Sequence, residues 1–304
     1  MLIFISLVVV CYNHRWWLVM FLSRIIRDVR EELKRIELPY NGEINIFKMN
    51  GDIVLVNFEG NENNYFIEYS NKGNLGGKYR NKLILENNGI KTGVIKGSEN
   101  IIVYEDYIYG DEYRPANEED FKNEDFIRSL AKWYKNFHSI KDLNGYNYFD
   151  CFCKENIRKV KEKYNLINNK FIEYVERNFD NINLKFRRTK DCFVVLDISM
   201  KNIVVSKKNP GLLIIDFNDV NKGNRSMDII SIFKFLDEKM QKVFYEEYEL
   251  ISEEEFVVND VVMCLAKLFL AIETPNKVTG ISDCLNFVVS EKMYEKAKLL
   301  VNWY

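Results

Sequence analysis

Three polar residues near the middle of the chain have the types and spacing that phosphate chemistry requires. Asp197 and Asn202 stand five positions apart in the segment VLDISMKNIVV, and Asp216 follows in LLIIDFND, 14 positions beyond Asn202. Phosphoryl transfer needs a carboxylate that orients the attacking hydroxyl and accepts its proton, and it needs oxygen ligands for magnesium ions that neutralise the phosphates. Asp197 is therefore a candidate base, and Asn202 and Asp216 are candidate metal ligands.

Two short apolar segments are expected to bring these residues together. The runs NIVVS and LLIIDF are typical of strands, and SKKNPG between them is typical of a turn, which predicts a hairpin. Both ends of that hairpin, carrying Asn202 and Asp216, would lie at the same edge. For Asp197 and Asn202 alone, an ordinary loop with Asx-type caps is the alternative. Asp216 at this distance favours the catalytic interpretation.

The first part of the chain is expected to be rich in strands. Ile25, Val29 and Leu33 recur at helical spacing and predict an amphipathic helix over 21–38. The segments INIFKM, IVLVNF and YFIEYS then predict an antiparallel meander. A helix in RNKLILENN is expected to end at Gly89, and GVIKGSENIIVYEDY predicts another hairpin.

The rest of the chain is expected to be helical. Helices are predicted over 118–140, over about 154–178, and from about residue 227 to the end, with the two strands of the candidate site standing alone among them. The prediction is an α+β fold of two lobes. A small antiparallel lobe spans residues 23–107, and a large helical lobe spans 108–304.

These segments together resemble a known family. The series LDISMKN, LLIIDFND and MD is similar to the catalytic segment of the aminoglycoside phosphotransferase and choline kinase family, relatives of the protein kinases that include a spore-coat kinase-like branch. IIVYEDYIYGDEY resembles the family's hinge strand, and LAKWYKNFHSI resembles the helix before its catalytic lobe. The resemblance covers about residues 43–236. It implies a protein-kinase-like two-lobe fold, with ATP and Mg²⁺ as cofactors and a small-molecule hydroxyl as acceptor.

The resemblance also implies a role for each matching position. Asp197 matches the catalytic aspartate, while Asn202 and Asp216 match the magnesium ligands. Asp228, in RSMDIISIF, matches an aspartate that supports the catalytic loop. The hinge backbone at Glu105, Asp106 and Tyr107 would bind the adenine.

Two positions depart from the family pattern. Val195 stands where the family has a histidine, which keeps the packing and loses a hydrogen bond. Glu68 stands on the predicted third strand in place of the lysine that binds phosphate, and Lys78 stands in place of its glutamate partner. The pair is expected to be exchanged, with an ion pair retained. In the alternative strand register, Lys72 or Lys78 is itself the phosphate lysine.

The composition predicts a folded chain without general affinity for nucleic acid. Of its 304 residues, 47% are hydrophobic, and the net charge of −2 provides no basic field. Six cysteines lack metal-ligand spacing and are expected to be free thiols, as in a reducing cytoplasm. His14 and His138 are the only histidines, which excludes a histidine-rich zinc centre, and His138 is expected to pack at a helix end.

The N-terminal segment is consistent with more than one cellular location of the protein. MLIFISLVVVCY and WWLVMFL are strongly apolar, but the polar residues between them include Arg15. A membrane anchor through residues 2–22 would place this arginine near the bilayer centre, at a cost of about 2.5–3.5 kcal/mol. A start at Met20 is another reading. We expect a cytoplasmic protein, with membrane contact only if this leader is real.

Two functions are consistent with these residues. The first is an ATP- and Mg²⁺-dependent phosphotransferase acting on a small-molecule hydroxyl, favoured by Asp197, Asn202 and Asp216. The second is a kinase-like binding or structural protein of a spore coat or envelope with impaired chemistry, favoured by Glu68 and Val195. A membrane-proximal sugar or lipopolysaccharide kinase is a third possibility. The sequence does not identify the substrate.

Overall fold

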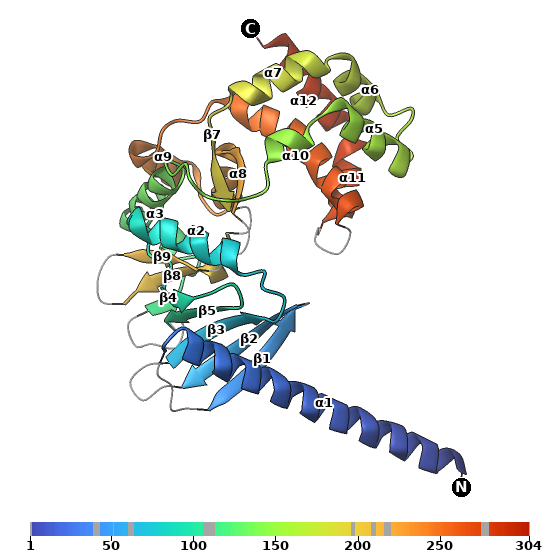
Figure 1. Ribbon diagram of the computed structural model, residues 1–304. Coiled ribbons are helices and arrows are strands. Elements are labelled where there is room, and N and C mark those ends of the chain that lie inside the picture. Colours follow the sequence, from blue (N-terminus) through green and yellow to red (C-terminus); the bar gives the residue numbers. More distant parts are fainter. Residues whose placement is uncertain are drawn as a thin grey trace. The chain divides into compact units, whose positions relative to one another are not determined.

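The computed structural model of the chain has two units, residues 1–114 with 206–208, and residues 115–205 with 209–304 (Figure 1). The structure describes residues 2–38, 43–50, 52–59, 64–105, 113–195, 198–207, 211–215, 220–274 and 280–303.

The first unit is built on an antiparallel sheet with the strand order β1-β2-β3-β5-β4. The predicted meander and the following hairpin are both present in it, and β5 pairs with β3 as well as with β4. The strands form because residues with high strand propensity alternate between the two faces. Their bounds are β1 Ile44–Asn50, β2 Ile53–Glu59, β3 Asn64–Ser70, β4 Val94–Gly97 and β5 Ile101–Glu105.

One helix packs on each face of this sheet. Helix α1 (Leu2–Arg35) begins well before the predicted amphipathic stretch and buries Ile25, Val29 and Leu33 against one face (Figure 1). Helix α2 (Gly76–Asn87) packs its first turns against the other face, next to Ile102 and Tyr104. Across the described residues, no helix combines the length and the apolar composition needed to cross a membrane.

Two glycines determine where α2 ends and how closely it packs against β4. Gly89 has a φ of +77° just after the helix, which confirms the predicted helix end. Gly97 allows close packing, because a Cβ there would lie 2.7 Å from the ring of Tyr79 on α2. A side chain at this position would push α2 away from β4.

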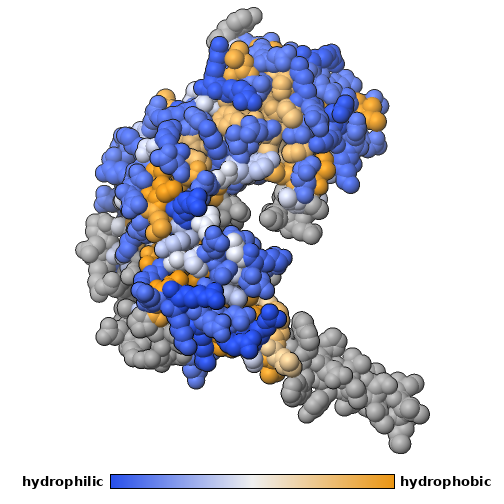
Figure 2. Space-filling view, viewed as in Figure 1, coloured by the Kyte–Doolittle hydropathy of each residue, from blue (hydrophilic) through white to orange (hydrophobic). Residues whose placement is uncertain are grey.

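The second unit is mainly helical. After β6 (Tyr113–Pro115), the buried stripes of its helices enclose a core through which α10 runs. On the face seen in Figure 2, hydrophilic residues cover most of its surface. Its helices are α3 Glu124–Phe137, α4 Tyr148–Cys151, α5 Lys154–Lys163, α6 Lys170–Arg177, α7 Phe179–Arg188, α8 Ser226–Phe233, α9 Glu238–Glu247, α10 Glu253–Glu273, α11 Ile281–Val288 and α12 Glu291–Asn302.

Two predicted helices have different bounds. Helix α3 begins at Glu124 because Asn123 caps it, accepting the N–H groups of Asp125 and Phe126, after a short 3-10 turn. The helix predicted over 154–178 is divided into α5 and α6, and Asn165 between them has a φ of 53°. A left-handed residue cannot continue a right-handed helix.

The strands of the second unit do not stand alone, so that expectation was wrong. The predicted hairpin is present as β8 (Ile203–Ser206) and β9 (Leu212–Ile214). A second antiparallel pair joins β7 (Asp191–Val195) to β10 (Val220–Asn224). This pair escaped prediction because β10 is polar and contains a glycine, and because β7 has no pairing partner near it in the sequence.

Candidate functional site

Asn202 lies at the open end of the β8–β9 hairpin. The strand register pairs Ile203 with Ile214, and the next facing residues are Asn202 and Ile215. The carbonyl oxygen of Asn202 accepts a hydrogen bond from the N–H of Ile215 at 2.8 Å. The hairpin therefore sets Asn202 beside the residue that precedes Asp216 in the chain.

The β7–β10 pair adjoins the same two segments in the sequence, since β7 precedes the first segment and β10 follows the second. Val195 pairs with Val220 at the end of this ladder. In the sequence, Asp197 comes two positions after Val195, and Asp216 comes four positions before Val220. Asp197 and Asp216 themselves lie outside the described residues, as do Asp106, Tyr107 and the side chain of Glu105.

Asp228 is a buried carboxylate that holds the end of β7. It lies in the first turn of α8, is 1% exposed, and accepts the N–H of Val195 at 2.9 Å and 3.0 Å to its two oxygens. Oδ2 also lies 3.0 Å from Nε2 of His138. The carboxylate thus joins α8 to the strand that leads to Asp197.

His138 continues this network to a buried phenol. Its Nδ1 lies 2.6 Å from the hydroxyl of Tyr248. Burial raises the pKa of Tyr248, so the phenol keeps its proton at neutral pH and donates it to Nδ1. This hydrogen-bond network places the imidazole proton on Nε2, where it donates to Asp228.

His138 and Tyr248 are residues whose role the sequence did not reveal. The expectation that His138 packs at a helix end is confirmed, since it is the C-cap of α3. Its hydrogen bonds join residues 90 and 110 positions apart, which local patterns cannot show. Val195, where the family has a histidine, is 4% exposed and contributes packing through its side chain and a donor through its backbone.

Glu68 and Lys78 form a buried ion pair in the first unit. Glu68 lies on β3 and points to the same face as Phe66, toward α2, because alternate residues of a strand share a face. Nζ of Lys78, in the first turn of α2, lies 2.7 Å and 2.6 Å from the two carboxylate oxygens. The side chains are 12% and 7% exposed for Lys78 and Glu68. The ion pair expected between these two residues is present.

The alternative strand register is not observed. Lys72 lies in the turn after β3, where Nζ forms an exposed ion pair with Asp52 at 2.8 Å. Lys78 lies on α2 rather than on the strand. Among the described residues of β3, the charged side chain facing α2 is that of Glu68.

A second buried lysine follows one turn later on α2, and sequence reasoning missed it. Lys82 is 2% exposed, and its Nζ lies 5.1 Å from the centroid of the Tyr104 ring on β5. This distance is within the range of a cation–π contact. The spacing of four positions from Lys78, which puts both ammonium groups on one side of the helix, was the available signal.

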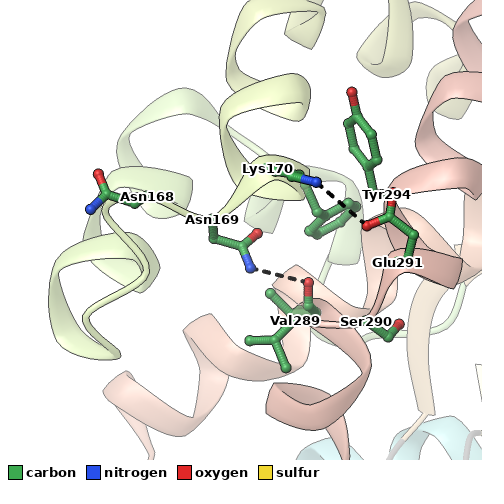
Figure 3. A pocket seen from close by; sticks show the side chains of 9 residues that line it. Asn168, Asn169, Lys170, Val289, Ser290, Glu291 and Tyr294 are labelled. Carbon is green, nitrogen blue, oxygen red and sulfur yellow. Dashed lines mark hydrogen bonds and ion pairs between the residues drawn. The ribbon is translucent and has the colours of Figure 1, made fainter.

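A cavity of about 240 Å³ lies in the helical unit (Figure 3). It opens where α6 and α12 begin, and Nδ2 of Asn169, which caps α6, donates to the carbonyl of Val288 at 3.4 Å. Lys170 and Glu291 at its rim form an ion pair of 3.8 Å. None of the candidate catalytic residues lines this cavity.

The described residues hold no cluster of three or more histidine, cysteine, aspartate or glutamate side chains that would bind a metal ion. The candidate magnesium site is of another kind, because Asn202 would contribute an amide oxygen and Asp216 lies outside the described residues. Its donors are the hard oxygen ligands that Mg²⁺ prefers.

Comparison with known proteins identifies the fold. The sequence matches no family model and no curated protein. The choline kinase LicA from Streptococcus pneumoniae has a TM-score of 0.57 and 16% identity over 92% of this chain and 100% of that one. The macrolide 2'-phosphotransferase MphH from Brachybacterium faecium has a TM-score of 0.59 and 8% identity over 91% and 97%. The spectinomycin phosphotransferase APH(9)-Ia, in complex with ADP and spectinomycin, has a TM-score of 0.51 and 14% identity over 91% and 98%.

The chain has the fold of these kinases. The expectation of a protein-kinase-like fold, with a small antiparallel sheet and a large helical part, is therefore confirmed. At sequence identities of 8–16%, these comparisons show the kinase-like fold and nothing beyond it.

Proposed function

We propose that this protein is an ATP- and Mg²⁺-dependent phosphotransferase that acts on a hydroxyl group of a small molecule. The observation that carries the proposal is the 2.8 Å hydrogen bond from Ile215 N–H to the carbonyl of Asn202. It joins the two segments in which a magnesium-binding amide and carboxylate are expected. The kinase-like fold supports the same reaction class, since the similar structures include choline kinase and two antibiotic phosphotransferases.

In this proposal four residues of the helical unit have distinct catalytic or supporting roles. Asp197 orients the acceptor hydroxyl and takes its proton. Asn202 and Asp216 would hold Mg²⁺, which neutralises phosphate charge when bound. Asp228 keeps the backbone of Val195 in place through two oxygens, and so positions the segment that carries the base.

In this proposal residues of the first unit bind the nucleotide. The backbone at Glu105, Asp106 and Tyr107 would bind the adenine. A cation is also needed for the phosphates. Lys82 supplies that cation in this proposal, because its ammonium group lies beside Tyr104, the residue before Glu105.

Replacing Lys82 by Met tests this assignment. We expect ATP to bind at least tenfold more weakly, since a charge-assisted hydrogen bond contributes about 1.5–3 kcal/mol. Adenosine, which has no phosphate, should bind as it does to the parent. Isothermal titration with both ligands measures this, and Lys72→Met, which removes an exposed lysine, is the matched control. Equal weakening for ATP and adenosine would mean that Lys82 is only structural.

Removal of a metal ligand tests the reaction class itself. At about 100 times its Kd, ATP with Mg²⁺ should stabilise the parent by about 2.7 kcal/mol. The Asp216→Ala variant should lose the Mg²⁺-dependent part of this stabilisation and keep its thermal stability without ligand. A thermal-shift titration with ATP, with and without Mg²⁺, measures both. If ATP with Mg²⁺ does not stabilise the parent, the enzyme proposal is wrong.

A second candidate function is a kinase-like binding or structural protein without transfer activity. The buried Glu68–Lys78 pair favours it, because a carboxylate occupies the strand position where the family has its phosphate-binding lysine. ADP formation measured over a panel of small hydroxyl compounds separates the two, because transfer to the acceptor leaves ADP. Nucleotide binding without ADP formation across the panel would support the binding protein.

A further inference from the structure

Two thiols of neighbouring helices contact each other in the helical unit. Cys264 lies on α10 and is 6% exposed, and Cys284 lies on α11 and is half-buried. The thiol of Cys264 donates a hydrogen bond to the carbonyl oxygen of Cys284 at 3.4 Å, which holds the two cysteines side by side. Both are free thiols in the structure, and no part of the proposed phosphotransferase uses them.

The environment of the pair distinguishes the two sulfurs. The neighbouring Cys264 thiol lowers the pKa of Cys284 to about 7, and burial opposes this effect. Lys267, one turn beyond Cys264 on α10, lowers it further, while Asp283 acts in the opposite direction. The pKa of Cys264 is raised by its interaction with Cys284 and by burial. Near neutral pH the thiolate of the pair is therefore on Cys284, while Cys264 keeps its proton.

We propose that Cys284 is a peroxide-reactive thiol and that Cys264 converts its oxidised form into a disulfide that joins α11 to α10. The Cys284 thiolate attacks a hydroperoxide, so that an S–O bond forms, the O–O bond breaks, and the departing oxygen leaves as water or an alcohol after taking a proton. The sulfur of Cys264 then attacks the sulfenic sulfur. An S–S bond forms, the S–O bond breaks, and the leaving hydroxide takes the Cys264 proton to become water.

Other thiols of the unit lack this combination. Cys151 shares a hydrogen bond with the Tyr146 hydroxyl at 2.6 Å, and burial raises its pKa to about 11. Cys192 is 2% exposed, and burial raises its pKa further. Cys153 is half-buried like Cys284, which makes it the matched control for accessibility. Selectivity for Cys284 would therefore come from its contact with Cys264 rather than from exposure alone.

The experiment treats the full chain with hydrogen peroxide, blocks remaining thiols, and maps the peptides by mass spectrometry. The expected product is a peptide pair linked through Cys264 and Cys284, lighter by two hydrogens and restored by a thiol reductant. In a Cys264→Ala variant the sulfenic acid should persist on Cys284 and be trapped by dimedone. In a Cys284→Ser variant no disulfide should form at Cys264.

The rate of oxidation provides a second measurement. It should rise about tenfold per pH unit below pH 7 and level off above it, because the thiolate is the nucleophile. The charged and titratable groups that face Cys284 are Lys267, Asp283, Tyr164 and Cys264. If Cys284 is labelled no faster than Cys153 in the folded parent, or if oxidation gives no Cys264–Cys284 link, the proposal is wrong. Neither of these two results depends on ATP binding, so failure of the thiol proposal would not contradict the proposed phosphotransferase function.

Discussion

Glu68→Lys and Lys78→Glu should each lower the free energy of unfolding by about 3–5 kcal/mol, and the double variant Glu68→Lys/Lys78→Glu should recover most of that loss. Each single change puts two like charges at a site where the side chains are only 12% and 7% exposed. A buried charge that has lost its partner is not rehydrated, and its new neighbour repels it. The double variant has an ion pair again, with the charges in opposite places.

Thermal unfolding of the four proteins measures this cycle. For a chain of this size the single variants should lose on the order of 10 °C in Tm. The control is Lys72→Glu beside Asp52, an ion pair of 2.8 Å whose side chains are 63% and 47% exposed. That change should cost at most about 1 kcal/mol, because exposed pairs contribute little. Losses that simply add in the double variant would show that the pair does not brace α2 against β3.

The double variant also bears on function. It places a lysine on β3 and a glutamate on α2, which is the arrangement of the family that the sequence resembles. If Mg²⁺-dependent stabilisation by ATP is greater in this variant than in the parent, the natural exchange of Glu68 and Lys78 weakens nucleotide binding. Equal stabilisation would favour Lys82 as the phosphate-binding cation.

Local sequence patterns were sufficient for much of the fold. Short apolar segments bounded by turn residues predicted β1, β2, β3 and the β8–β9 hairpin, because such segments are typical of strands. The amphipathic stripe around Val29 and the glycine at position 89 predicted parts of α1 and α2 for similar reasons. The exchanged positions of Glu68 and Lys78 could be expected because the two segments also resemble the family in order and length.

Contacts between distant parts of the chain could not be predicted in this way. The pairing of β7 with β10 depends on the tertiary fold, since neither strand has a clear period of its own. The burial of Lys82 against Tyr104 contradicts the usual preference of lysine for the surface. His138 gave no signal beyond its place at a helix end, although it is the link between Asp228 and Tyr248.

Asp228→Ala should destabilise the helical unit by about 2–4 kcal/mol, because two buried donors lose their acceptor at a cost of roughly 1–3 kcal/mol each. The donors are the N–H of Val195 and Nε2 of His138. Asp228→Asn keeps the shape but offers one acceptor oxygen in place of two, so it should cost less than the alanine variant. Denaturant unfolding of both variants measures the order.

Hydrogen exchange at the Val195 amide shows whether the loss is local to β7. In the parent this amide should be protected, since it donates to both oxygens of a carboxylate that is 1% exposed. In Asp228→Ala its protection should fall more than that of its strand neighbour Val194. Tyr248→Phe is the matched control, because it removes only the hydroxyl that donates to His138 and should cost about 1 kcal/mol. Protection of Val195 that is unchanged in Asp228→Ala would contradict the idea that this carboxylate positions the segment leading to Asp197, and any fall in phosphotransfer would then need another cause.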